Sequence, residues 1–213
     1  MRNGRSGRPR NYIKIAKASL VVVDIQNDYC HKDGVFGKKG FDLSHVQMAV
    51  ENLVPLLEVC RASTLPVIFV RTVHSSWTDS PAWKDRLGGA GKKLRICYPG
   101  TWGSEFYKVK PLPGEYVVTK HRFSAFAGTD LHLVLRAKNI ETIFLCGITT
   151  NVCVESTARY AIDLDFRVVL IEDCCGALSA EEHVAALTNM ERYFGRVSNS
   201  AELCDLLRGR GQS

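Results

Sequence analysis

The strongest constraint on the fold is the alternation of short, β-branched apolar runs with longer segments of helical periodicity. Residues 19–24 (Ser-Leu-Val-Val-Val-Asp) form one such run, which is typical of a strand buried on both faces of a parallel sheet. Residues 44–63 follow, with apolar side chains at helical spacing. Because strand, helix and strand in this order form a right-handed crossover unit, the repetition of this order predicts a three-layer α/β/α domain.

The same patterns predict the remaining elements. We expect six strands in a mostly parallel sheet, at residues 19–24, 65–70, 115–119, 142–146, 167–171 and 194–197. We expect helices at residues 44–63, 131–138, 152–163 and 180–193. Residues 75–114 are rich in Gly, Pro, Trp and Lys and are predicted to be a long irregular segment, and segments of that length usually carry function.

Composition excludes several classes of protein. The chain has 213 residues, of which 46% are hydrophobic and 23% charged, as in one globular domain and unlike a disordered or fibrous chain. The longest apolar run near the start, Leu20–Val23, is too short for a spanning helix or a signal peptide. We therefore expect a cytoplasmic protein with no membrane partner. The expected organisation is a basic tail at 1–18, one domain at 19–207 and a second tail at 208–213.

The net charge of +6 resides at the two ends of the chain. Its sources are Arg2, Arg5, Arg8 and Arg10 near the start and Arg208 and Arg210 near the end, which leaves residues 11–207 with no net charge. A protein that binds nucleic acid carries its basic residues on the folded surface. We therefore interpret these arginines as solvated tails, with a weak contact to an anion as the alternative, and expect no nucleic-acid partner.

The eight cysteines show no C-x-x-C pair and no zinc-finger spacing with histidine. They are Cys30, Cys60, Cys97, Cys146, Cys153, Cys174, Cys175 and Cys204. Several lie inside apolar runs, where a free thiol packs as a small hydrophobic group. We expect reduced thiols rather than a disulfide framework.

Three chemically distinct side chains follow the ends of expected strands. Asp24 ends the first strand, Lys120 follows the third, and Cys153 follows the fourth after the turn at residues 147–151. Because parallel strands end at one edge of the sheet, where such sheets bind ligands, we expect these side chains to converge. A carboxylate, an ammonium group and a thiol are the groups that a nucleophilic cysteine requires.

Cys153 is the best candidate for the nucleophile. We expect it in the first turn of a helix capped by Asn151, where backbone N–H groups and the helix dipole stabilise a thiolate. Asp24 is the candidate that takes the thiol proton and passes it to a leaving amine, and Lys120 favours both anions. Each residue alone also has a structural interpretation, as a buried thiol, a strand-end cap and a solvated charge.

Three segments together resemble the isochorismatase-like cysteine hydrolases, which include nicotinamidases, N-carbamoylsarcosine amidases and ureidoacrylate amidohydrolases. The segments are Val21–Tyr29, Lys120–Leu131 and Gly147–Ala158. With the order of the strands, the resemblance covers residues 19 to about 207. It implies a Rossmann-like hydrolase domain with a catalytic triad of Asp24, Lys120 and Cys153.

The resemblance also implies the surroundings and the chemistry of the triad. A non-proline cis peptide between Ile148 and Thr149 would direct the N–H groups of Thr149 and Cys153 at an oxyanion. The implied reaction is attack on an amide or ureido carbonyl, release of ammonia or an amine, and hydrolysis of a thioester. The family further implies a homodimer or homotetramer and no cofactor.

Departures from the family pattern favour one branch. Nicotinamidases place Asp-x-His after the second strand to hold a metal, whereas this chain has Thr72-Val73-His74, so we expect no metal. Isochorismatases that cleave a vinyl ether lack the cysteine. The run 150–157, Trp102 and Tyr29 are most similar in type to the ureidoacrylate amidohydrolases.

Further residues are candidates for binding the substrate. They are Tyr29, Arg71, His74, Trp102, Arg122 and Ile148. Arg71 and Arg122 are suited to a substrate carboxylate, or equally to an ion pair with the protein, and His74 either lines the pocket or lies in a surface loop. The leading hypothesis is an amidohydrolase for a small ureido, carbamoyl or amide compound. A nicotinamidase, a biuret-type hydrolase and a non-catalytic binding or scaffold protein are the alternatives.

Overall fold

The structure, a computed structural model, describes residues 13–86 and 95–209. Six strands form a single parallel sheet in the order β3-β2-β1-β4-β5-β6. They are β1 (Ala18–Val23), β2 (Val67–Thr72), β3 (Tyr116–Lys120), β4 (Thr142–Ile148), β5 (Arg167–Gly176) and β6 (Arg196–Ser198). The chain order reverses between β1 and β4, and open α/β sheets bind their ligands beyond such a reversal.

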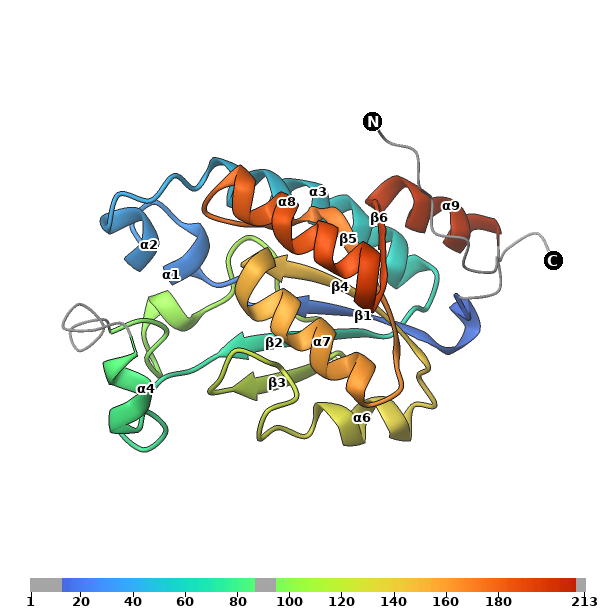
Figure 1. The fold of residues 1–213 in the computed structure, drawn as a ribbon. Helices are drawn as coiled ribbons and strands as arrows, with labels where there is room; N and C mark the ends of the chain where they lie inside the picture. The colour runs from blue at the N-terminus through green and yellow to red at the C-terminus, as the bar shows by residue number, and fades with distance from the viewer. Residues whose placement is uncertain (1–12, 87–94, 210–213) are drawn as a thin grey trace.

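Helices cover both faces of this sheet (Figure 1). On one face, α3 (Ser44–Ala62) packs against β5 and against α9 (Ser200–Gly209). The other face carries α6 (Leu131–Ala137), α7 (Glu155–Asp163) and α8 (Ala180–Asn189). Right-handed crossovers require this division, because the chain turns back across the sheet after β3. The predicted three-layer α/β/α architecture is therefore confirmed.

Burial on both faces explains the apolar runs in the strands. All six residues of β1 and all seven of β4 are buried. On α3, the residues that face the sheet are buried, namely Val46, Ala49, Val50, Leu53, Leu56, Leu57 and Cys60. Pro55 lies inside α3 on its exposed side, so the helix passes through the position where the sequence favours a kink. Burial of each large apolar side chain contributes about 1.5–3 kcal/mol.

The expected elements are present, with differences at their ends. Strand β4 continues to Ile148 and β5 to Gly176, because the two strands pair again after a register shift. Cys174 and Cys175 therefore lie within β5 and not after it. The last long helix is divided into α8 and a π-helical turn at Met190–Phe194. Helix α9 was not predicted, although Asn199 accepts a hydrogen bond from the Glu202 backbone N–H as a capping residue does.

Regular secondary structure is present on the far side of residues 19 and 207, where the domain is expected to begin and end. Ala18 begins β1, and the preceding lysines Lys14 and Lys17 both form ion pairs with Glu141. At the other end, α9 continues to Gly209. Arg2, Arg5, Arg8, Arg10 and Arg210 lie outside the described residues. Among residues 13–86 and 95–209, no helix has both the length and the apolar character needed to cross a membrane.

Candidate active site

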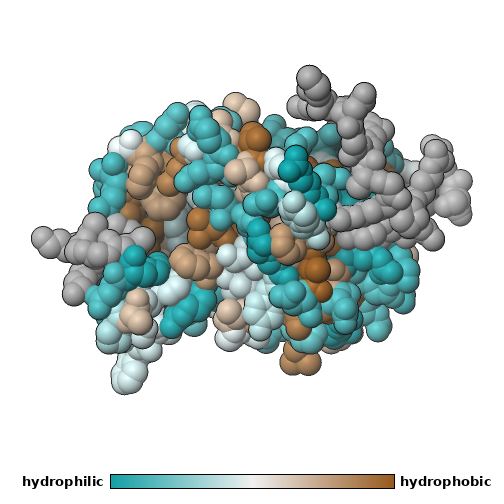
Figure 2. Space-filling model, in the orientation of Figure 1, coloured by the Kyte–Doolittle hydropathy of each residue, from teal (hydrophilic) through white to brown (hydrophobic). Residues whose placement is uncertain are grey.

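A cavity of about 320 Å³ opens at the edge of the sheet where the strands end. In Figure 1 the arrowheads of the strands point to this side, which also carries the short helices α1 (Asn27–Cys30), α2 (Val35–Lys38) and α4 (Pro81–Asp85). In Figure 2, apolar residues are visible on this side of the molecule among hydrophilic ones, and also near the centre of the same face. Thr72, Lys120 and Cys153 line the cavity, so the ends of β2 and β3 and the segment after β4 meet there.

Asp24 is placed by a sharp turn at the end of β1. Its φ of 56° lies in the left-handed region, which costs energy for any residue with a Cβ atom. The turn is held by hydrogen bonds from the Asp24 N–H to the Val70 carbonyl (2.9 Å) and from the Gln26 N–H to the Asp24 carbonyl (2.9 Å). Asp24 is fully buried, so its carboxylate needs charged or donating partners within the protein.

Lys120 is the common neighbour of the other two predicted triad residues. Its Nζ lies 2.8 Å from Asp24 Oδ2 and 3.4 Å from Cys153 Sγ. Lys120 is 1% exposed, and its ammonium group also donates to the Arg122 carbonyl at 3.0 Å. The structure thus brings the carboxylate, the ammonium group and the thiol together, as the sequence indicates.

The protonation of these groups follows from their burial. Burial alone lowers the pKa of Lys120, but the Asp24 carboxylate and Cys153 outweigh it, so the pKa is raised and the ammonium group stays charged. Burial raises the pKa of the Cys153 thiol to about 12, and Asp24 adds to this while Lys120 opposes it. The expected stabilisation of a resting thiolate is therefore wrong. The site holds an ion pair beside a neutral thiol.

The segment that carries Cys153 has an unusual backbone. Gly147 has a φ of 128°, and a Cβ atom there would lie 2.0 Å from the Val23 carbonyl oxygen, so only glycine fits between β4 and β1. The peptide bond between Ile148 and Thr149 is cis. Cys153 then lies in a five-residue π-helical turn at Thr150–Val154. Asn151 lies within this turn and does not cap α7.

Four of the six predicted substrate-binding residues line the cavity, and two do not. The four are Tyr29, His74, Arg122 and Ile148. Arg71 lies within β2, where its side chain is exposed and donates to Thr119 Oγ1. Trp102 is 47% exposed and its ring packs edge-on against His31. The strand expected at residues 65–70 instead continues through Thr72, so Arg71 lies inside β2 and not beyond its end.

Two further residues that the sequence did not indicate, Trp83 and Arg86, also line the cavity. The Arg86 guanidinium lies 3.5 Å from the centre of the Trp83 ring and 5.2 Å from that of Phe123. The Arg122 guanidinium lies 4.7 Å from the same Trp83 ring. Both residues come from the irregular segment between β2 and β3, where periodicity gives no signal. The Ser80-Pro81 start of α4 was the available sign of local order.

His74 has a buried acidic partner. Its Nδ1 lies 2.8 Å from Asp79 Oδ1, and both side chains are 9% exposed. This pairing directs Nδ1 at the protein and leaves Nε2 as the nitrogen available to a ligand. Among residues 13–86 and 95–209, no group of three or more His, Cys, Asp or Glu side chains is arranged to hold a metal ion.

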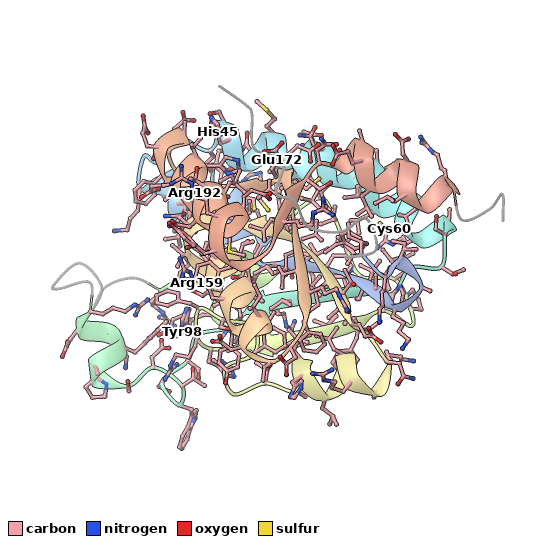
Figure 3. All side chains as sticks on the ribbon, turned by 45° about the vertical axis from the view of Figure 1, so that its right-hand side comes forward. His45, Cys60, Tyr98, Arg159, Glu172 and Arg192 are labelled. Atoms are coloured by element: carbon pink, nitrogen blue, oxygen red, sulfur yellow. The ribbon has the colours of Figure 1, made fainter. Side chains whose placement is uncertain are left out.

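The other cysteines are placed as structural residues. Cys146 and Cys174 are fully buried, and burial raises the pKa of each thiol. Cys30 is also fully buried beside the Asp24 turn, with a raised pKa. Figure 3 shows Cys60 toward the end of α3 opposite to His45. Cys153, in contrast, is only partly buried and lines the cavity.

Comparison with known sequences finds one matching family model and relatives that align with most of the chain. A family model described as the isochorismatase domain matches residues 18–202. The ureidoacrylate amidohydrolase RutB of Agrobacterium fabrum is 31% identical over 211 residues, which cover 92% of each chain. The protein of the same name from Variovorax paradoxus is 35% identical, over 85% of this chain and 77% of its own.

Solved structures share the fold over nearly the whole chain. A cysteine hydrolase from Pseudomonas syringae pv. phaseolicola matches with a TM-score of 0.83 and 26% identity, covering 96% of this chain and 99% of its own. N-carbamoylsarcosine amidase from Thermoplasma acidophilum has a TM-score of 0.70 and 31% identity, over 86% and 96% of the two chains. Nicotinamidase PncA from Bacillus subtilis has a TM-score of 0.72 and 25% identity, over 86% and 99%.

Proposed function

The chain belongs to the isochorismatase family and is a hydrolase that acts on carbon–nitrogen bonds, and from this premise we propose that Cys153 is its nucleophile and that Asp24 and Lys120 complete a catalytic triad. The observation that carries the proposal is the pair of distances from Lys120 Nζ, 2.8 Å to Asp24 Oδ2 and 3.4 Å to Cys153 Sγ. The substrate is a small ureido, carbamoyl or amide compound.

The first half of the reaction forms a covalent intermediate. Because the thiol is neutral, Asp24 takes its proton as the sulfur attacks the carbonyl carbon of the substrate. Lys120 stabilises the sulfur while its charge develops, because it is held charged next to it. The carbonyl oxygen becomes an oxyanion, which the N–H groups of Thr149 and Cys153 bind. The carbon–nitrogen bond then breaks, and Asp24 gives its proton to the leaving amine.

The second half returns the enzyme to its starting state. A water molecule loses a proton to Asp24 and attacks the carbonyl carbon of the thioester. The carbon–sulfur bond breaks, and Asp24 returns the proton to the sulfur of Cys153. One water is consumed, and ammonia or an amine and an acid are released, so no oxidant, reductant or cofactor takes part in any step.

The lining of the cavity favours a substrate with a negative charge. Two guanidinium groups, those of Arg86 and Arg122, line it, against the single carboxylate of Glu182 among the described residues. Arg122 Nη1 donates to the carbonyls of Thr78 and His121, whereas Arg86 Nη1 donates to the Trp83 carbonyl alone, so Arg86 keeps more N–H groups for a ligand. A guanidinium binds a carboxylate with two parallel hydrogen bonds. We therefore propose a ureido or N-carbamoyl acid, in keeping with relatives that are named ureidoacrylate amidohydrolases.

A nicotinamidase activity is the second candidate. It is favoured by the aromatic side chains of Trp83 and Phe123, which lie with ring centres 4.8 Å apart in the cavity and would pack against a flat ring. A structural relative is a nicotinamidase. Nicotinamide carries no charge for Arg86 to bind, so this candidate predicts that the charge on the substrate has no effect on turnover.

The quaternary structure and location follow from the family resemblance. We propose a homodimer or homotetramer in the cytoplasm, whose size light scattering of the purified protein measures. A monomer at micromolar concentration would contradict this part of the proposal. The triad lies within one chain, so its chemistry does not depend on the outcome.

The deciding experiment measures ammonia release by the wild-type protein and by Cys153→Ala. The panel consists of an N-carbamoyl β-amino acid, biuret, nicotinamide and a simple aliphatic amide. Cys204→Ala is the matched control, because it removes a partly buried thiol from α9 on the far side of the sheet from α7. We expect release from the N-carbamoyl acid by the wild type and Cys204→Ala and none by Cys153→Ala. Turnover by Cys153→Ala within tenfold of wild type would refute the proposed nucleophile.

A further inference from the structure

The hydroxyl group of Thr72 lies between the two charged members of the proposed triad. Lys120 Nζ donates a hydrogen bond to Thr72 Oγ1 at 2.7 Å, and Thr72 Oγ1 donates to Asp24 Oδ1 at 3.0 Å. Thr72 is the last residue of β2 and is 3% exposed. It lines the cavity but carries no charge, and the triad chemistry described above does not use it.

The direction of these hydrogen bonds is fixed by chemistry. An ammonium group has three donors and no acceptor, so the Thr72 oxygen accepts from Lys120. The single hydroxyl hydrogen of Thr72 is then left for the other neighbour, Asp24 Oδ1. A deprotonated carboxylate accepts hydrogen bonds only, which agrees with this assignment.

The two oxygens of Asp24 therefore differ. Oδ1 receives the Thr72 hydroxyl hydrogen. Oδ2 lies 2.8 Å from Lys120 Nζ, but it is buried and receives no hydrogen bond of acceptable geometry from any described residue. Its lone pairs are attracted by the ammonium charge and remain available to a proton.

The Thr72 side chain is held in place from behind. The Gln26 side-chain amide bonds both backbone groups of Thr72, with Nε2 donating to the Thr72 carbonyl at 2.9 Å and Oε1 accepting from the Thr72 N–H at 2.8 Å. Gln26 Nε2 also donates to the Ser104 carbonyl at 2.8 Å, and Gln26 is fully buried. Since threonine is stiff about its first side-chain torsion, a fixed backbone fixes the hydroxyl.

We propose that Thr72 is a positioning residue that makes Oδ2 of Asp24 the oxygen that takes the Cys153 proton and keeps the Lys120 ammonium group directed at the sulfur. The proposal rests on the proposed triad. The proton moves from Sγ to Oδ2 and later from Oδ2 to the leaving nitrogen. The Thr72 hydroxyl keeps its own hydrogen in every step, so its contribution is to geometry and to the stability of the charged carboxylate.

The test compares Thr72→Val, which has the same shape without the hydroxyl, with Thr72→Ser, which keeps the hydroxyl. Steady-state kinetics on the best substrate of the panel are measured across pH. For Thr72→Val we expect kcat to fall about 10- to 100-fold with KM nearly unchanged, because hydrogen bonds to two charged groups are lost. The acid limb of the pH profile of kcat/KM moves to higher pH, because the charged carboxylate loses a stabilising donor. Thr72→Ser restores kcat to within about threefold of wild type.

Thr119→Val is the matched control. Thr119 precedes Lys120 in β3 and pairs with Arg71 in the register of the sheet, and its hydroxyl accepts from the Arg71 side chain and not from the site. Successive residues of a strand point to opposite faces, so Thr119 faces away from Lys120. We expect wild-type kcat and an unchanged pH profile for this variant.

Specific results would overturn the inference. A folded Thr72→Val protein with wild-type kcat and acid limb would overturn it, and so would a Thr72→Ser protein as impaired as Thr72→Val, which would indicate a packing role. Should Thr72→Val not fold, as judged by near-ultraviolet circular dichroism, Thr72→Ala is judged by the same criteria. Cys153→Ala in the same assay separates the two proposals. If it retains activity the triad is wrong, whereas if it is inactive beside a normal Thr72→Val, only the inference about Thr72 fails.

Discussion

The ammonium nitrogen of Lys120 lies 2.8 Å from the carboxylate of Asp24, with side chains that are 1% and 0% exposed. Transfer of either charge from water into this environment is costly, and each charge is tolerable only because the other is present. The pair therefore has two consequences that can be measured separately. It affects the stability of the fold, and it determines how readily the neighbouring thiol ionises.

The first prediction concerns stability. Lys120→Met leaves the Asp24 carboxylate buried without its cation, and we expect it to lower the free energy of unfolding by about 3–5 kcal/mol. The double variant Asp24→Asn/Lys120→Met has no unpaired charge and recovers a large part of that loss. Urea denaturation monitored by circular dichroism provides both values.

The control for this cycle is Lys17→Met. Lys17 pairs with Glu141 at the surface, where its side chain is 51% exposed, and a pair of this kind contributes about 1 kcal/mol or less. If Lys120→Met lowers the free energy of unfolding by no more than Lys17→Met does, the Asp24 carboxylate does not require the Lys120 cation for the stability of the fold.

The second prediction concerns the pH dependence of alkylation at Cys153. The pKa of this thiol is raised to about 12, chiefly by burial, from the ordinary value near 9. Only the thiolate reacts, so the rate of labelling by iodoacetamide rises about tenfold for each pH unit from pH 7 to 10 without a plateau. Mass spectrometry of the peptide that contains Cys153 separates it from Cys204, which is also partly buried. A plateau below pH 9 would contradict the raised pKa.

The third prediction separates the role of Asp24 in proton transfer from its effect on the thiol. The negative charge of Asp24 raises the pKa of Cys153, whereas Lys120 lowers it. In Asp24→Asn the pKa falls, and we expect alkylation of Cys153 at pH 8 to become faster by about threefold for each unit of the decrease, since the thiolate becomes more abundant but less nucleophilic. Turnover falls by at least about 100-fold, because the general base is absent. Slower alkylation together with lost turnover would indicate a disrupted site instead.

The convergence of Asp24, Lys120 and Cys153 could be predicted from the sequence because the topology of the sheet largely determines where these residues lie. Asp24 and Cys153 follow the buried strands β1 and β4, Lys120 ends β3, and parallel strands end at one edge whatever their exact lengths. Errors of one or two residues at the ends of β1, β3 and β4 therefore did not affect the expected convergence. A similar error at the end of β2 misplaced Arg71, because its role depended on whether it lies inside β2 or after it.

The ionisation of the site could not be read from local sequence. A cysteine near the start of a helix suggests a stabilised thiolate, but the burial of Cys153 and the nearby Asp24 carboxylate raise its pKa by more than Lys120 lowers it. Burial depends on contacts between distant segments. The Trp83–Arg86 contact is local, at the end of α4, but it lies in an aperiodic segment where the sequence pattern gives no signal. The extension of β5 likewise depends on its second pairing with β4 after a register shift. Helix α9 is different, because its cap at Asn199 was visible in the sequence.

The fourth prediction concerns the close approach of β4 to β1. In Gly147→Ala the new methyl group would lie 2.0 Å from the Val23 carbonyl oxygen, at a φ of 128°. Backbone must move at the position that leads to Cys153, so we expect a loss of stability of more than about 3 kcal/mol together with loss of activity. Gly128→Ala is the matched control, since its φ of 69° is also positive but no atom lies within 4 Å of the added Cβ. We expect Gly128→Ala to lower the free energy of unfolding by only about 1–2 kcal/mol. Thermal unfolding measures both variants. Equal losses would mean that the steric contact at Gly147 is unimportant.

The fifth prediction tests which arginine recognises the charge of the substrate. Arg86 lines the cavity with its guanidinium over Trp83, whereas Arg71 does not line the cavity and donates to Thr119. For an N-carbamoyl acid, we expect Arg86→Gln to lower kcat/KM about 10- to 100-fold, mainly through a higher KM, because a hydrogen-bonded charge is lost. The methyl ester of the same acid should be affected less than about threefold, since it has no charge to bind. Arg71→Gln is the control and should leave both substrates unchanged. If Arg86→Gln reduces kcat/KM equally for acid and ester, Arg86 shapes the cavity and does not read the carboxylate, and the proposal of an anionic ureido substrate loses its structural support.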